Sequence, residues 1–218
     1  MKARFQEFKP DRFSFHDDPV LVLEEFWTPG EMKLFQDAMA RSRWKSLAEM
    51  PDVARAFPNC GNWAKAEIGA PERGAFLERM ALPSIFDYIE SFPNIKQRHV
   101  SSNYYSYAAG DSLSTHDDTD EAYASDPRER APRRRLAMVS YLHNEWHMDW
   151  GGELILYQVR RDREGKQVYD ISHCIAPQPG SFVLFTVPRF HRVCRVDALA
   201  GSHKRLSIAG WFMTEHEI

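Results

Sequence analysis

A histidine and an aspartate lie two residues apart at the end of the stretch from Tyr104 to Asp118. On an extended backbone the side chains at positions i and i+2 leave the same face, so His116 and Asp118 can converge on one point. An imidazole and a carboxylate are two of the three ligands in the two-histidine, one-carboxylate site that binds non-haem Fe(II) and leaves open positions for substrate and oxygen. The best candidate for the third ligand is His191, which follows the apolar run at residues 182–185.

Short β-type segments must position these side chains. From Ile95 onward, segments typical of strands alternate with turns and charged loops. This pattern indicates a sandwich or jelly roll rather than alternating βαβ units. We expect the polar stretch Thr119–Arg134 to be a mobile loop beside the metal. The strands are expected at residues 98–107, 113–118, 135–143, 153–159, 168–175, 181–186, 192–196 and 205–213.

The N-terminal region, residues 1–94, is expected to support this β core with helices and irregular structure. The compact apolar segment Val20–Leu23 predicts a strand. Thr28-Pro29-Gly30-Glu31 has the N-cap, N1 and N3 residues of a capping box, which predicts a helix that continues to about residue 42. Further helices are expected at residues 72–80 and 83–92, and irregular structure at residues 45–70, where Pro and Gly recur.

Composition limits the class of protein. A chain of 218 residues can bury one sizeable core, so we expect a single domain over residues 1–218, with the β core at residues 95–218 and the N-terminal helices packed on its sheet. The fold class is therefore mainly β with flanking helices (α+β). A net charge of -3 gives no general attraction to nucleic acid or to anionic membranes, and neither is expected as a partner.

The three cysteines and the N-terminus bear on the compartment. Cys60, Cys174 and Cys194 are widely spaced, which argues against a disulfide framework and against structural zinc. The N-terminus lacks the apolar segment of a signal peptide, and no stretch is apolar enough to span a bilayer. A cytoplasmic location is expected.

An ordered set of further residues accompanies the His-x-Asp pair. In this order they resemble the prolyl 4-hydroxylase-like branch of the Fe(II)/2-oxoglutarate-dependent dioxygenases, which includes the oxygen-sensing prolyl hydroxylases. The match extends over about residues 95–213, and its order makes it far more specific than any single motif. The matching residues are Tyr107, Gly110, His116, Asp118, Arg135, Tyr141-Leu142, Trp146, Gly151-Gly152-Glu153-Leu154, Pro177, Gly180, Phe185, His191-Arg192-Val193, Arg205, Ser207 and Trp211.

The resemblance implies a double-stranded β-helix that holds Fe(II) through His116, Asp118 and His191. It also implies an oxygenase that uses O2 and 2-oxoglutarate, hydroxylates an unactivated C–H bond and releases succinate and CO2, with ascorbate as a candidate stimulant. The expected substrate is a prolyl residue or another amino-acid-type group in a protein, a peptide or a small molecule. In related halogenases a small residue replaces the carboxylate, so Asp118 favours hydroxylation.

The same resemblance assigns the residues that hold 2-oxoglutarate. Its distal carboxylate must be paired if buried, and the planar guanidinium of Arg205 can pair with it through two hydrogen bonds. Ser207, two residues on, would share the strand face of Arg205, whereas Lys204 would face the other way. Tyr141 matches the phenol that hydrogen-bonds this carboxylate, and Tyr107 is a second candidate.

Two other functions remain open from the sequence. One is a non-catalytic jelly-roll binding module descended from such enzymes, against which the intact ligand set and Arg205 both argue. The other is a cupin-type metal enzyme that needs no 2-oxo acid and would have no use for Arg205.

Other polar and aromatic residues near the motif are expected to be structural. Asp117 should point away from the metal. His143 and His147 are expected to be surface or hydrogen-bonded histidines, and Arg133-Arg134-Arg135 a solvated face rather than a nucleic-acid site. Trp44, Phe57 and Trp63 are expected in the core, with a pocket wall as the alternative.

Overall fold

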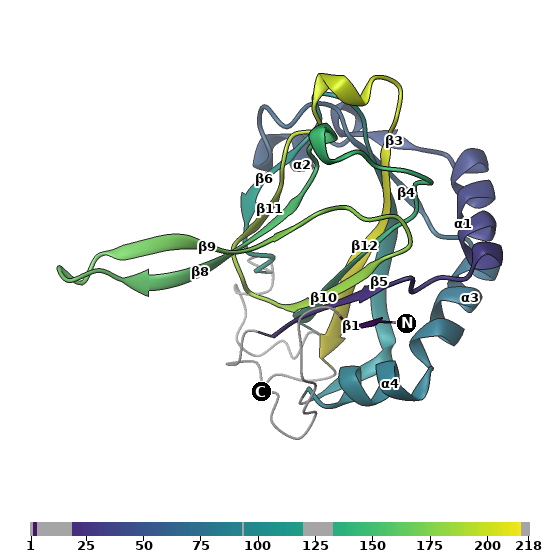
Figure 1. Cartoon of the computed structure of the whole chain (residues 1–218), viewed down its shortest axis with the longest axis horizontal. Coiled ribbons are helices and arrows are strands. Elements are labelled where there is room, and N and C mark those ends of the chain that lie inside the picture. Colours follow the sequence, from purple (N-terminus) through teal and green to yellow (C-terminus); the bar gives the residue numbers. More distant parts are fainter. Residues whose placement is uncertain (1, 4–18, 93, 120–132, 215–218) are drawn as a thin grey trace.

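The computed structural model describes residues 2–3, 19–92, 94–119 and 133–214, and its main feature is a pair of antiparallel β-sheets (Figure 1). The larger sheet has the order β1 (Lys2–Ala3), β2 (Val20–Glu24), β10 (Phe182–Thr186), β7 (Arg134–Tyr141), β12 (Arg205–Thr214), β5 (Ile95–Tyr107), β4 (Ala64–Glu67) and β3 (Lys45–Ser46). The smaller sheet has the order β6 (Leu113–His116), β11 (His191–Val193), β8 (Leu154–Arg161) and β9 (Gln167–Ile175). The strands expected from the sequence after Ile95 are all present, with ends that differ by a few residues.

Within the described residues, four α-helices lie N-terminal to β5: α1 (Pro29–Arg41), α2 (Pro51–Ala56), α3 (Ala70–Met80) and α4 (Pro83–Glu90). Short 3-10 helices occur at Leu47–Glu49, Met148–Trp150 and Ala198–Ala200. The predicted capping box starts α1, because the Glu31 amide donates to the Thr28 hydroxyl oxygen at 3.3 Å and the Thr28 amide donates to the Glu31 carboxylate at 2.8 Å. Figure 1 shows α1, α3 and α4 along one side of the larger sheet. No helix in the described ranges is long and apolar enough to cross a membrane.

The larger sheet buries both of its faces. Successive strand residues point to opposite faces, so Leu21 and Leu184 pack with the helices while Val22 and Val183 pack in a second cluster with strands of the smaller sheet. This arrangement explains why β2 and β10 read as continuous apolar runs rather than as alternating patterns. Helices α1, α3 and α4 therefore cover one face of the larger sheet, and the other face is available to line a site.

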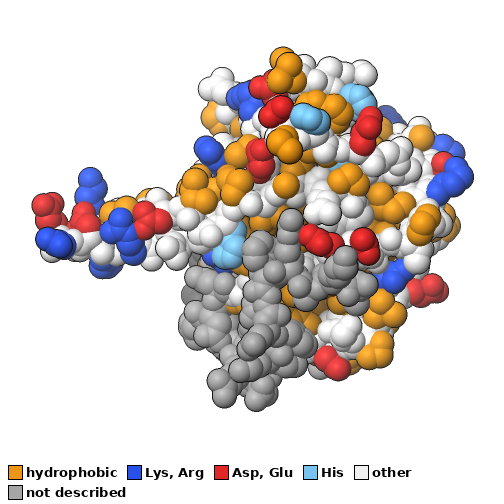
Figure 2. Space-filling view, in the orientation of Figure 1, with side chains coloured by type: hydrophobic (Ala, Val, Ile, Leu, Met, Phe, Trp, Pro, Cys, Tyr) orange, Lys and Arg blue, Asp and Glu red, His pale blue; other side chains and the backbone are white. Residues whose placement is uncertain are grey.

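The β8–β9 hairpin projects from the body of the molecule (Figure 1). Its outer part carries charged side chains of both signs, as Figure 2 shows. The apolar side chains of Val159, Tyr169 and Ile171 on this hairpin are also exposed.

The region at residues 45–70 corrects the sequence-based expectation of irregular structure. It contains β3, α2 and β4, and β4 pairs with β5 along Ala64–Glu67. The segment Ala-Lys-Ala-Glu has little intrinsic preference for a strand, so pairing with β5 decides its conformation. Pro51 starts α2 at its first turn instead of interrupting a helix. Most of the expected loop at Thr119–Arg134 falls at residues 120–132, outside the described residues.

Close packing of β12 against β5 gives a test of the larger sheet. A Cβ atom on Gly210 would overlap the backbone of Ser101 and Ser102, so Gly210→Ala should lower the free energy of unfolding by about 1–3 kcal/mol. Gly74 lies exposed in α3 with no atom within 4 Å of an added Cβ, so Gly74→Ala should raise it by about 0.5–1 kcal/mol. Urea denaturation of both variants should give changes of opposite sign. Equal effects would contradict this packing.

Candidate metal centre and its cavity

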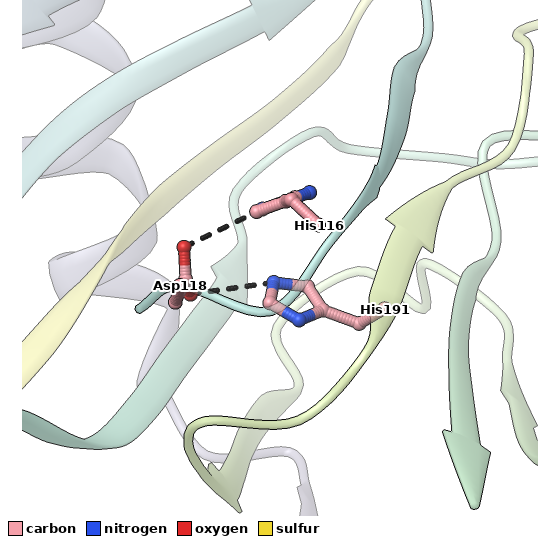
Figure 3. A group of neighbouring side chains, drawn as sticks. All are labelled: His116, Asp118 and His191. Atoms are coloured by element: carbon pink, nitrogen blue, oxygen red, sulfur yellow. Dashed lines mark ion pairs between the residues drawn. The ribbon is translucent and has the colours of Figure 1, made fainter. Parts of the chain in front are cut away.

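The pairing of β6 with β11 brings two histidines together. His191 is the cross-strand partner of His116, and their ring centroids are 4.1 Å apart. The Asp118 carboxylate faces both rings from one side, with Oδ1 at 3.4 Å from His116 Nε2 and Oδ2 at 3.3 Å from His191 Nε2 (Figure 3). The ligand atoms of the three residues all lie within 4.8 Å of one another, close enough to bind a single metal ion. The sequence therefore predicted this convergence correctly.

Asp118 reaches the centre by a different backbone path from the one expected. The expected strand at residues 113–118 ends at His116, and Asp118 has a left-handed conformation with φ of 63°. Its carboxylate is fixed by Trp211, whose Nε1 donates to Oδ2 at 2.6 Å. Asp117 turns elsewhere: its carboxylate accepts from the Thr119 amide at 3.0 Å, and its carbonyl accepts from the Arg189 amide at 3.1 Å.

Burial, hydrogen bonds and charges shift the pKa values of Asp118 and His116. Burial alone would raise the pKa of Asp118, but the hydrogen bond and charge of His191, the charge of His116 and the Trp211 hydrogen bond outweigh it and hold the pKa at about 2. Burial, with the neighbouring His191, lowers the pKa of His116 to about 4. The Nδ1 atoms of the two histidines lie 2.8 Å from Ser114 O and 2.7 Å from Arg189 O. Because these carbonyls can only accept, Nδ1 of each ring carries a proton, and Nε2 is the nitrogen that faces Asp118 and can bind a metal.

A cavity of about 260 Å³ adjoins the three residues. β12 lines it through alternate residues, because side chains two apart on a strand share one face. Its full lining is Val53, Phe57, Trp63, Lys65, Tyr105, Tyr107, Leu113, His116, Asp118, Arg134, Ala137, Met138, Val139, Leu154, Phe185, His191, Val193, Arg205, Ser207, Ala209, Gly210 and Trp211.

Arg205 contributes a buried positive charge to this cavity. The residue is 1% exposed, and its Nε donates to Gly152 O at 2.8 Å. Among the described residues no carboxylate pairs with it, and the nearby Ser207 Oγ is buried without a hydrogen-bond partner. A buried guanidinium and an unsatisfied hydroxyl on one strand face are suited to an entering carboxylate. Lys204 is exposed, as the register argument expected.

The two candidate tyrosines differ in position. Tyr107 lines the cavity and its ring centroid is 5.3 Å from the Arg205 guanidinium carbon. Among the described residues, Tyr141 is not part of the lining, and its hydroxyl instead accepts from Arg205 Nη2 at 3.3 Å. Tyr107, the second candidate from the sequence, therefore lies closer to the open space than Tyr141, the first.

A pocket wall was expected only as the alternative for Phe57 and Trp63, and the sequence carried no sign that Val53 and Lys65 line the cavity. Phe57 and Trp63, expected mainly in the core, both line the cavity, and the Phe57 ring lies 5.3 Å from the His116 ring. Trp63 is also 4% exposed, so it is both core and wall. Val53 and Lys65 complete this side. Val53 and Lys65 lie in a part of the sequence with neither helical nor strand periodicity, so the sequence did not indicate what these side chains face.

His143 and His147 lie apart from the metal centre. His143 is buried, and its Nε2 donates to Pro177 O at 2.7 Å, which fits the hydrogen-bonded role expected for it. His147 is exposed.

Comparison with known proteins gives the family. Residues 102–213, half of the chain, match the family described as the 2OG-Fe(II) oxygenase superfamily. The chain belongs to this superfamily. A prolyl 3-hydroxylase of Mus musculus is 34% identical over 108 residues, which are 49% of this chain but 17% of that protein. The chain thus spans less than a fifth of the length of this curated relative.

Solved structures with a similar fold share little sequence. A Pseudomonas putida prolyl-4-hydroxylase matches with a TM-score of 0.58 and 17% identity, covering 88% of this chain and 91% of that one. A Trichoplax adhaerens prolyl hydroxylase, solved with a peptide fragment of the hypoxia-inducible factor oxygen degradation domain, gives 0.53 and 19%, covering 90% and 84%. A viral collagen prolyl hydroxylase from Paramecium Bursaria Chlorella virus-1, in a 2-oxoglutarate complex, gives 0.55 and 14%, covering 89% and 96%.

These findings confirm the cofactors expected from the sequence. Membership of the superfamily gives Fe(II), 2-oxoglutarate and O2 as the metal and co-substrates. The donor set of two imidazoles and one carboxylate fits Fe(II), and the buried Arg205 guanidinium with the unsatisfied Ser207 hydroxyl on β12 fits a carboxylate.

Acid should destabilise the metal-free protein through His143. Burial lowers the pKa of His143 to about 4, whereas that of a histidine in the unfolded chain is about 6.5. Between these pH values the unfolded chain binds one more proton than the folded chain. The free energy of unfolding should therefore fall by up to about 1.4 kcal/mol for each unit by which the pH is lowered. His143→Gln should remove this part of the pH dependence of the free energy of unfolding, as measured by urea denaturation between about pH 4 and pH 6.5. His147→Gln is the control, and the same slope change in both variants would contradict the assignment.

The Trp211 hydrogen bond should matter for the metal. Trp211→Phe keeps an aromatic ring but removes the donor to Asp118, so Fe(II) affinity should fall about tenfold or more. Anaerobic competition with a chromogenic chelator measures this affinity. Trp44→Phe, which removes a hydrogen bond to Met39 O far from the centre, is the matched control. An unchanged affinity in Trp211→Phe would refute the role of this contact.

Proposed function

We propose that this protein is a hydroxylase that uses Fe(II) and 2-oxoglutarate to hydroxylate an unactivated C–H bond of an amino-acid-type substrate. The observation that carries the proposal is the presence of two unlike sites in one cavity. One is the cluster of His116, Asp118 and His191, and the other is the pair of Arg205 and Ser207. We further propose that the two sheets form the double-stranded β-helix implied by the family.

In this proposal His116, Asp118 and His191 hold the iron. Both imidazoles are oriented by backbone carbonyls and the carboxylate by Trp211, so the ligands are held in place before the metal arrives. Three protein ligands leave positions for other groups. The bound metal and 2-oxoglutarate supply the oxygen activation and release succinate and CO2.

Arg205 and Ser207 hold the distal carboxylate of 2-oxoglutarate in this proposal. The carboxylate neutralises the buried guanidinium and gives Ser207 Oγ the acceptor that it lacks. Tyr141 keeps Arg205 in place through its hydroxyl, and Tyr107 lies over the guanidinium at the edge of the cavity. In this proposal these polar groups serve to orient 2-oxoglutarate.

The remaining wall is largely apolar and excludes water from the reaction. Phe57, Leu113 and Val193 are among the side chains near the histidines. Exclusion of water protects reactive species from side reactions.

The relatives support a prolyl residue, in a peptide or protein, as the substrate. The curated relative is a prolyl 3-hydroxylase, and the solved neighbours are prolyl hydroxylases, one of them with a peptide fragment. A non-catalytic binding module has no need for both a metal cluster and a buried cation. A cupin-type enzyme without a 2-oxo acid has no use for Arg205.

Anaerobic reconstitution tests the proposal. Fe(II) and 2-oxoglutarate together should give the weak visible charge-transfer absorption of the ternary complex, and His191→Ala should abolish it. Arg205→Met should retain Fe(II) but weaken 2-oxoglutarate binding about a hundredfold, because a buried charged partner is lost. His147→Ala, at an exposed histidine, is the control. Full absorption in His191→Ala, or no succinate formation in air by the wild type, would refute the proposal.

A further inference from the structure

One side of the cavity comes from residues outside the match to the superfamily. Val53 and Phe57 come from α2 and the residue after it, and Lys65 comes from β4, whereas the match begins at residue 102. Phe57 lies against the ring of His116, so this side adjoins the proposed metal. It is therefore placed to meet a substrate.

Strand register puts Lys65 on the cavity face of the larger sheet. Lys65 lies opposite Tyr105 on β5, and Tyr105 lies opposite Ser207 on β12. Residues directly opposite one another in a ladder share a face, so Lys65 is on the same face as Ser207. All three residues line the cavity.

The charges in the cavity favour an anion. Bound Fe(II) and 2-oxoglutarate cancel in formal charge, and Asp118 offsets one guanidinium, so two positive charges remain among Arg134, Arg205 and Lys65. Arg134 lies over the Trp211 ring at 3.9 Å and is 3.9 Å from the Asp118 carboxylate. The ammonium group of Lys65 has no hydrogen bond or ion pair within the described part of the chain.

A second lysine adds positive charge next to Lys65. Lys45 on β3 lies directly opposite Lys65, and like charges opposite one another destabilise a sheet. An anion bound at this edge would offset the repulsion.

We propose that Lys65 binds a carboxylate of the substrate while an apolar part of the substrate lies against Val53 and Phe57. The inference rests on the proposed hydroxylase function and narrows its substrate to amino acids or peptides that carry a carboxylate close to the hydroxylated carbon. An α-carboxylate and an acidic side chain present the same chemistry to Lys65.

Matched pairs of probes test the charge directly. N-acetyl-L-proline and its amide differ only in the α-carboxylate, and the amide-capped peptides acetyl-Pro-Glu and acetyl-Pro-Gln differ only in a side-chain carboxylate. Binding to the Fe(II)–2-oxoglutarate complex is followed by the change in its visible absorption, and turnover by succinate. Wild type, Lys65→Met and Lys65→Arg are compared, with Lys166→Met at the exposed end of the β8–β9 hairpin as the control.

At least one acid probe should bind the wild type about tenfold more tightly than its amide partner, as a charged hydrogen bond predicts. Lys65→Met should lose this preference, Lys65→Arg and Lys166→Met should keep it, and 2-oxoglutarate affinity should be unchanged in all three. The pair that shows the preference identifies the source of the carboxylate.

Equal binding of acid and amide forms, no binding by any acid probe, or a preference that persists in Lys65→Met would overturn the inference. Weakened 2-oxoglutarate binding in Lys65→Met would assign Lys65 to the co-substrate instead. If the wild-type complex with Fe(II) and 2-oxoglutarate still shows its visible absorption, such results would leave the proposed hydroxylase function standing. If the wild type shows no such absorption, both the hydroxylase function and the role of Lys65 would be refuted.

Discussion

The pairing of β6 with β11 is the interaction on which the site depends. It sets two histidines opposite each other although they are 75 positions apart in sequence, and it turns both Nε2 atoms toward one carboxylate. A slip of one residue in this register would turn one imidazole to the other face of the sheet. The neighbouring pairing of β11 with β8 fixes β11 from its other side, so the register of His191 is set by two partners.

Arg205 imposes the second constraint. A guanidinium that is 1% exposed and has no acidic partner among the described residues is costly to bury, and its hydrogen bonds to Gly152 and Tyr141 repay only part of that cost. An anion that binds beside such a group would offset this cost by pairing with its charge. Under the proposed function, the ligand-free protein is less stable because of this buried charge, and the same charge binds the carboxylate of 2-oxoglutarate.

Most of the β core was predictable from sequence because its strands are apolar, short and separated by turns. The same clarity held for α1, whose capping box is local and needs no tertiary information. Asp118 shows the limit of this reasoning: its convergence on the histidines was correct, but a left-handed turn and Trp211 place it, not an extended strand. β4 shows a different limit. Its conformation comes from pairing with β5, so neither the strand nor the position of Lys65 in the cavity could be read from a local pattern.

The two-faced burial of the larger sheet ties catalysis to the integrity of the fold. On β12, Ser207 faces the cavity while Ile208, the next residue, packs among the helices. A shift of the helical layer therefore moves the same backbone that carries the proposed co-substrate site. Heat inactivation should consequently coincide with loss of the helix–sheet core, because one strand, β12, belongs both to that core and to the cavity wall.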